Sequence, residues 1–186
     1  LYIMASEDNT KVTIPGSDNP IILHQGQSKH LSVEQGDIIT SDKKVQVDLL
    51  TGDIGSIYEL RWYSLLPVDD WSAEYISPMG DTIGETRVVL YNPSSSSIDV
   101  KVMTLDWNAT YNIGGKSSVF TRFIETGSGA KFTQENGNNF FALSMTDTNA
   151  NGTGQIFDWG FPVLPTRDLT SQVLIGWGFG CTGNSC

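Results

Sequence analysis

Charged side chains are scarce in this chain, and most of them are acidic. Only 17% of its 186 residues are Asp, Glu, Lys or Arg, against roughly 25% in an ordinary globular protein. The 21 acidic and 11 basic residues give a net charge of −10 at pH 7. Because that charge repels a phosphate backbone, we expect no nucleic-acid partner.

Long apolar runs and helical periodicity are also missing. No apolar segment approaches the roughly 18 residues that a membrane-spanning helix needs, so we expect no membrane insertion. Nowhere do apolar residues recur at the spacing of a helical face over a dozen positions. No Gly-rich loop leads from a strand into a helix, which leaves nucleotide binding without support.

The residues that are abundant favour turns and strands. The chain has 19 Ser, 17 Thr, 19 Gly and 11 Asn, while 39% hydrophobic residues suffice for a packed core. Short alternating or apolar runs recur between turn clusters, which predicts an all-β fold. The expected strands span residues 10–14, 21–23, 29–33, 45–50, 57–65, 87–91, 98–105, 118–124, 131–133, 140–146, 155–161 and 172–177.

Several segments in the first half of the sequence resemble segments in the second half, and they occur in the same order, which predicts an internal duplication. The best match sets residues 66–72 against 164–170, each beginning with Leu-Pro, and each is preceded by a Trp, Trp62 or Trp159. We therefore predict two tandem β-sandwich modules, residues 1–86 and 87–186, with the two Trp side chains in their cores. Charge divides unevenly: residues 1–88 carry 14 acids and 6 bases, net −8, and residues 89–186 carry 7 and 5, net −2.

Cysteine is almost absent, and the two that occur lie close together. Cys181 and Cys186 flank a short polar loop, so we expect a local disulfide, with bonds to another chain or to a missing segment as alternatives. Sequons at Asn108 and Asn151 fit a secreted glycoprotein. The chain begins inside an apolar run without an initiator Met, which suggests a mature product or a piece of a longer secreted protein.

One loop has the spacing of calcium ligands. Oxygen-bearing residues fall at positions 1, 3, 5, 7, 9 and 12 of residues 147–158, with Gly at position 6, and a hard cation needs such alternating oxygens in a tight turn. A plain hairpin loop would have the same composition. The expected ligands, and hence the only cofactor considered, are those of a Ca²⁺ site: Asp147, Asn149, Asn151, Thr153, Gln155 and Asp158.

Catalytic constellations are not found, so we predict that the protein is not an enzyme and has no catalytic residues. His24 and His30 fit surface strand positions, and the neighbouring Asp69 and Asp70 would point to opposite faces of a strand. Two tryptophans with polar neighbours, Trp71 and Trp107, are candidates for stacking on a sugar. The alternative is that they cover a core or pack the two modules together.

The strand phrases resemble a known family. Residues 3–14, Gly26-Gln27, residues 36–47 and residues 65–75 are similar to the N-terminal domain family named after the IgG Fc-binding protein of mucus, which also occurs in microbial surface proteins. The resemblance implies a secreted or cell-surface β module and supplies no catalytic residues.

The function expected from all of these features is non-enzymatic. We predict an extracellular adhesion or recognition module that binds a protein or glycan. A structural subunit or spacer of a surface fibre or layer, joined to copies of itself through sheet edges, is the alternative. A glycan hydrolase that uses Asp70 or Asp168 is a third hypothesis.

Overall fold

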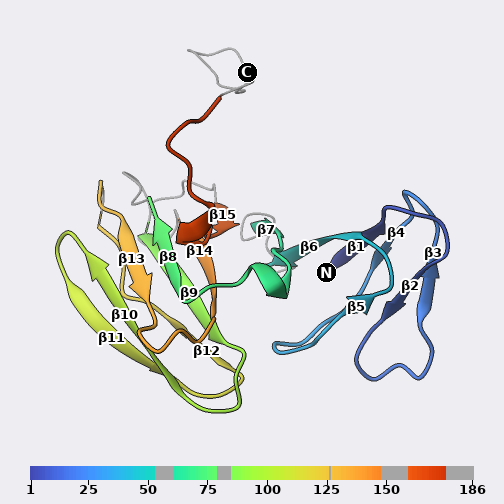
Figure 1. Ribbon diagram of the computed structural model, residues 1–186, viewed down its shortest axis with the longest axis horizontal. Helices are drawn as coiled ribbons and strands as arrows, with labels where there is room; N and C mark the ends of the chain where they lie inside the picture. The colour runs from blue at the N-terminus through green and yellow to red at the C-terminus, as the bar shows by residue number, and fades with distance from the viewer. Residues whose placement is uncertain (53–60, 79–84, 126, 148–158, 175–186) are drawn as a thin grey trace.

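The computed structural model describes residues 1–52, 61–78, 85–125, 127–147 and 159–174. The predicted all-β fold is confirmed: these residues form strands in four antiparallel sheets and, as helix, only two single 3-10 turns. Figure 1 shows strands β1–β6 gathered on one side and β8–β15 on the other, with β7 between them. No helix among the described residues is long and apolar enough to cross a membrane.

The first two sheets enclose the smaller core. Their strand orders are β4-β1-β6-β7 and β3-β2-β5. The strands are β1 (Tyr2–Ala5), β2 (Thr10–Thr13), β3 (Ile21–Leu23), β4 (Ser28–His30), β5 (Thr40–Ser41), β6 (Val45–Thr51) and β7 (Arg61–Ser64). Alternate residues of β1 and β2 point inward, so that Ile3, Ala5 and Val12 are buried together with Leu23 and Leu31.

The last two sheets enclose the larger core, with strand orders β12-β9-β14-β15 and β11-β10-β13-β8. The strands are β8 (Glu74–Ser77), β9 (Glu85–Asn92), β10 (Ile98–Thr104), β11 (Asn108–Ile113), β12 (Ser117–Phe120), β13 (Ala130–Thr133), β14 (Phe141–Asp147) and β15 (Trp159–Pro162). The strict alternation of β10, which buries Ile98, Val100 and Val102, shows which face meets this core.

The strand order of the two pairs of sheets is the same. The order β4-β1-β6-β7 becomes β12-β9-β14-β15 when eight is added to each strand number, and β3-β2-β5 becomes β11-β10-β13 in the same way. Among the described residues, β8 is the one strand without a counterpart. The duplication of the sequence stays a prediction, as does the division at residues 86 and 87. The hydrogen bonds place β8, which precedes that division, beside β13 in a sheet of the second pair.

The two Leu-Pro stretches adopt the same local conformation. Pro67 (φ −53°, ψ 147°) begins the 3-10 turn η1 (Val68–Asp70), and Pro165 (φ −55°, ψ 144°) begins η2 (Thr166–Asp168). The fixed φ of proline suits the start of such a turn. The turns also touch, because the guanidinium of Arg167 donates to the carbonyl oxygens of Asp70 at 2.5 Å and Trp71 at 3.2 Å.

Further hydrogen bonds join the two pairs of sheets. The buried guanidinium of Arg61 in β7 donates to the carbonyl oxygen of Thr146 in β14 at 3.2 Å. The Gln35 side chain accepts from the Ser118 hydroxyl at 2.8 Å and donates to the carbonyl oxygen of Lys116. These contacts tie residues that lie more than 80 positions apart in the sequence.

Tyr75 anchors β8 in the larger core. Its side chain is fully buried, its hydroxyl donates to the carbonyl oxygen of Phe140 at 2.6 Å, and it accepts from the Ser72 amide at 2.8 Å. Burial raises the pKa of the Tyr75 hydroxyl from 10.0 to about 12, because the charged phenolate would lose its hydration.

The raised pKa predicts a stability that falls in alkali. The folded state holds the Tyr75 proton more tightly than the unfolded state, so this contribution is present below about pH 10 and is lost as the pH rises toward 12. A shift of this size is worth roughly 2–3 kcal/mol. The Tyr75→Phe variant has no such proton. We expect it to have a lower free energy of unfolding than the wild type at pH 8, and we expect this difference to shrink above pH 10. Urea denaturation at stepped pH measures it. A difference between the two proteins that stays constant from pH 8 to pH 11.5 would contradict this assignment.

The prediction that Trp62 fills a core is wrong. Arg61 and Tyr63 are buried, and the intervening Trp62 therefore points outward and is 54% exposed. Its ring stacks on Tyr2 with centroids 5.3 Å apart, and Tyr2 in turn contacts the His30 ring. The outer face of the first sheet thus carries an aromatic strip, Tyr2, His30 and Trp62, while Trp159 in β15 is half-buried.

The prediction of a strand over residues 172–177 also fails where it can be examined. Residues 172–174 are exposed and pair with no strand in the described part of the chain, and residues 175–177 lie outside that part. Figure 1 shows this red segment running away from the sheets.

Candidate functional site

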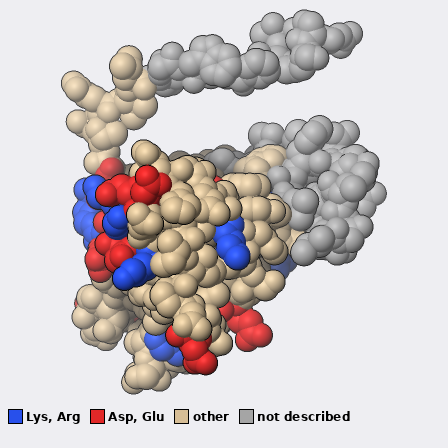
Figure 2. Space-filling model, turned by 90° about the vertical axis from the view of Figure 1, so that its right-hand side faces the viewer, with Lys and Arg blue, Asp and Glu red and all other residues tan. Residues whose placement is uncertain are grey.

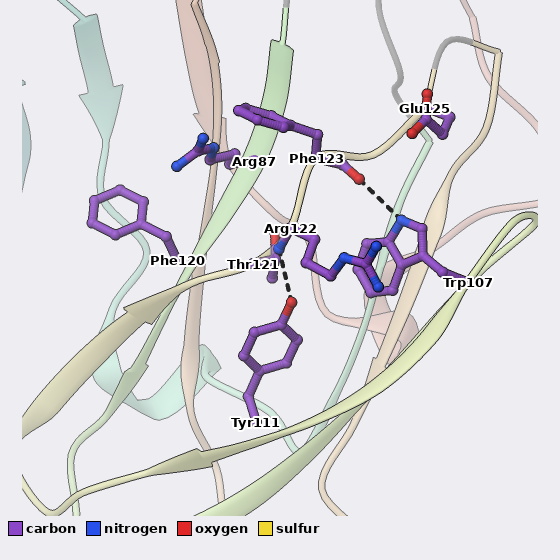
Figure 3. Close-up of a pocket in the computed structure, with 8 residues that line it drawn as sticks. All are labelled: Arg87, Trp107, Tyr111, Phe120, Thr121, Arg122, Phe123 and Glu125. Carbon is purple, nitrogen blue, oxygen red and sulfur yellow. Dashed lines mark hydrogen bonds between the residues drawn. The ribbon is translucent and has the colours of Figure 1, made fainter.

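A pocket of about 400 Å³ opens beside Trp107, one of the two tryptophans predicted to bind a ligand. It lies where the turn before β11 meets the segment that follows β12 (Figure 3). Its lining consists of aromatic and charged side chains around one threonine: Arg87, Trp107, Tyr111, Phe120, Thr121, Arg122, Phe123 and Glu125.

The segment that follows β12 is fixed to β9 by hydrogen bonds at both ends. The Thr121 amide donates to the carbonyl oxygen of Val88 at 3.0 Å, and the Thr121 hydroxyl accepts from the Val88 amide at 3.0 Å. Three residues later the Ile124 amide donates to the carbonyl oxygen of Thr86 at 2.9 Å. Thr121 and Ile124 are buried, so Arg122 and Phe123 between them are held in place while their side chains face the pocket (Figure 3).

Trp107 is held from both its backbone and its ring. Its amide donates to the Thr104 hydroxyl at 3.0 Å, and its indole N–H donates to the carbonyl oxygen of Phe123 at 3.0 Å. Figure 3 shows the latter bond crossing the pocket rim. The indole N–H is therefore satisfied within the protein, and what the half-buried ring offers a ligand is its apolar surface.

Two arginines lie on aromatic rings in the pocket. The guanidinium carbon of Arg122 is 5.5 Å from the Trp107 ring centroid, and that of Arg87 is 3.7 Å from the Phe123 ring centroid. A guanidinium stacked in this way keeps the N–H groups at its edge available for a carboxylate. Neither arginine forms an ion pair with an acidic side chain in the described part of the chain. The pocket thus combines apolar surface with two cations that lack an acidic partner there.

Tyr111 and Phe120 complete the lining. The Tyr111 hydroxyl accepts from the Arg122 amide at 2.7 Å, which fixes the start of the arginine's segment against β11. Phe120 is 55% exposed, and Glu125 is exposed on the other side of the opening. An exposed Phe beside two arginines suits a ligand that has both an apolar face and a carboxylate.

The other predicted ligand-binding tryptophan, Trp71, lies elsewhere and packs against neighbouring rings. Its ring stacks on Phe141 with centroids 4.8 Å apart and meets Tyr91 edge-on, while its indole N–H donates to the carbonyl oxygen of Leu66 at 3.3 Å. Trp71 does not line the pocket beside Trp107. Its ligand-binding role stays a prediction.

The structure describes only some of the residues predicted to carry glycans, form a disulfide or bind calcium. Asn108 is exposed at the start of β11, an edge strand, and lines a second hollow of about 620 Å³ on the outer face of β10 and β11. Asp147 ends β14, and the other expected calcium ligands lie outside the described residues, as do Cys181, Cys186 and the sequon at Asn151. Among the described residues no three His, Cys, Asp or Glu side chains gather to hold a metal.

Sequence reasoning found Trp107 and missed the groups around it. Arg87 comes from β9, about 20 positions before Trp107. Tyr111 lies in β11, Phe120 ends β12, and the other partners follow β12. The available signal was the cluster Phe120-Thr121-Arg122-Phe123, an aromatic and basic stretch in a chain with only 11 basic residues.

Comparison with known proteins agrees with the resemblance seen in the sequence. The family model described as IgGFc binding protein matches residues 1–155, which include every residue that lines the pocket. No curated protein and no solved structure matches the chain.

Proposed function

Because the chain belongs to the IgGFc-binding protein family, we propose that it is a non-enzymatic module of a secreted or cell-surface protein that recognises an extracellular glycoprotein. The observation that carries this proposal is the pair of stacked arginines in the Trp107 pocket. The family supports a protein partner, and the pocket chemistry supports contact with a carboxylate on that partner.

A sialylated glycan is the ligand that this chemistry favours. Its acidic sugar has a carboxylate for the edge of the Arg122 guanidinium and an apolar ring face for the exposed Phe120 side chain. An Asp or Glu side chain of the partner protein would offer the same carboxylate. The two sources are separated by removing the sugar.

We expect Arg122→Ala to weaken binding of an immobilised sialylated glycoprotein at least tenfold, because truncating a paired charge costs about 2 kcal/mol or more. Trp107→Ala should have a comparable effect, since Arg122 then loses the ring on which it stacks. Surface plasmon resonance with the intact chain provides the measurement. Trp62→Ala is the matched control, because Trp62 is also a half-exposed tryptophan but lies on β7.

The arms of this experiment give distinct results. Loss of binding after sialidase treatment of the glycoprotein supports the glycan as the ligand. Binding that survives sialidase but depends on Arg122 assigns the contact to a carboxylate of the protein partner. Binding that Arg122→Ala and Trp107→Ala leave unchanged would exclude the pocket as the recognition site.

A structural role in an assembly of copies is the second candidate function. The observation that favours it is the edge of the sheet β3-β2-β5, which no described strand covers, whereas its counterpart β11-β10-β13-β8 has one strand more.

A further inference from the structure

The extra strand β8 shows how one group of strands supplies a strand to the next. β8 follows β7 and η1 in the chain, yet it pairs antiparallel with β13 of the second group, from Glu74 opposite Thr133 to Ser77 opposite Ala130. The pairing buries Tyr75 completely, and an ion pair of 2.7 Å joins Glu74 to Lys131. The edge of β13 is thereby covered by a segment that the preceding group provides.

A corresponding segment follows η2 and has no strand partner among the described residues. Counting from Pro67 and Pro165, which begin the two turns, Tyr75 corresponds to Val173 and Ile76 to Leu174. Val173 is 77% exposed and Leu174 is 94% exposed. Their counterparts in β8 are much less exposed, because Tyr75 is buried and Ile76 is 37% exposed.

The corresponding acceptor edge is also open in the part of the chain that the structure describes. β5 occupies the place of β13 and, among the described strands, pairs with β2 alone, with Ser41 opposite Val12 and Thr40 opposite Thr13. The Asp42 amide donates to the carbonyl oxygen of Lys11. Because backbone groups alternate in direction along a strand, Thr40 and Asp42 face β2 and the backbone groups of Ile39 and Ser41 face the open edge.

The surroundings of this edge suit an apolar, uncharged strand. Ile38 is 65% exposed beside β5, and Ile39 packs partly against the smaller core. The segment from residue 169 to residue 174 carries no charge, so it meets no repulsion from the part of the chain that carries net −8.

We propose that residues 171–174 of one copy of this chain add as a strand to the β5 edge of a second copy. Val173 then takes the inward position that Tyr75 occupies in β8, and copies join head to tail as an open chain or a ring. The proposal rests on strand pairing and not on the Trp107 pocket, so each can fail without the other.

Sedimentation equilibrium of the intact chain under reducing conditions, which remove disulfide links between chains, tests the proposal. We expect the weight-average mass to rise with protein concentration for the wild type. Val173→Asp should reduce association at least tenfold, because the strand would then place a carboxylate at a core position. Its folding should be unaffected, since Val173 is exposed in the single chain. Thr170→Asp is the control that adds the same charge just before the segment.

A mixing experiment fixes the direction of assembly. Ser41→Pro removes a donor from the open edge of β5 and leaves the residue 171–174 segment intact. Mixed with Val173→Asp, which keeps its β5 edge, it should form one-to-one dimers that grow no further. A wild type that stays monomeric at all concentrations to 1 mM would overturn the proposal, and so would a Val173→Asp variant that associates with itself as strongly as the wild type does. The Val173→Asp comparison decides this even where Ser41→Pro does not fold.

Discussion

Replacing Phe132 by alanine is expected to lower the free energy of unfolding by roughly 3–5 kcal/mol. Phe132 is fully buried in β13, where it lies opposite Val102 on one neighbouring strand and Tyr75 on the other. The substitution leaves a cavity between the two sheets of the larger core, because backbones paired on both sides cannot collapse into it. Urea denaturation followed by circular dichroism measures the change.

Phe120→Ala is the matched control for that substitution. Phe120 is 55% exposed at the end of β12, so we expect its loss to cost less than about 1 kcal/mol. The same variant should weaken glycoprotein binding, because Phe120 lines the pocket. Equal losses of stability in the two variants would contradict the burial of Phe132 in the larger core.

Replacing Asn92 by alanine is expected to cost about 3 kcal/mol, because one buried side chain serves several backbone groups. Its amide nitrogen donates to the carbonyl oxygens of Ser96, Ile113 and Gly114 at 2.7–3.1 Å. Its carbonyl oxygen accepts from the amide and the hydroxyl of Ser94. Asn92 is fully buried, so alanine would remove the side-chain partner of the Ile113 and Gly114 carbonyls and of the Ser94 amide, whereas the Ser96 carbonyl keeps its bond from the Ser94 hydroxyl.

Asn112→Ala is the control for the Asn92 substitution. The Asn112 amide also donates a hydrogen bond, to Asp99 at 2.8 Å, but both side chains are exposed. We expect a change within about 0.5 kcal/mol. Melting temperatures from calorimetry should then separate the two variants by several degrees. Coincident melting curves would show that the Asn92 hydrogen bonds do not support this end of the sandwich.

The all-β fold could be predicted because alternation along single strands is a local property. Residues 21–23 were predicted as the strand that they form, and β10 was predicted within one residue of its end. β11 was missed because its sequence, Asn-Ala-Thr-Tyr-Asn-Ile, is mostly polar, as suits an edge strand with one solvated face. β5 was missed because two residues cannot display a period, and β8 because a four-residue strand gave too weak a signal.

The site was only partly predictable, for a related reason. Trp107 stood out because polar residues flank it in the sequence. Its stacking partner Arg122 is 15 positions away and reaches the ring through the hydrogen bonds that fix residues 121–124 to β9. The inward or outward direction of Trp62 depended on strand register, and a shift of one residue reverses it.

The most direct test of the recognition site is a nuclear magnetic resonance titration of the ¹⁵N-labelled chain with sialyllactose. The five tryptophans give five indole N–H signals, and Trp107→Phe assigns the one from the pocket. The structure predicts that this signal shifts as the sugar is added, because the Trp107 indole N–H is bonded to the carbonyl oxygen of Phe123 at the pocket rim. A titration in which no indole signal moves, or in which only the signal of Trp62 moves, would contradict recognition of the acidic glycan in the Trp107 pocket.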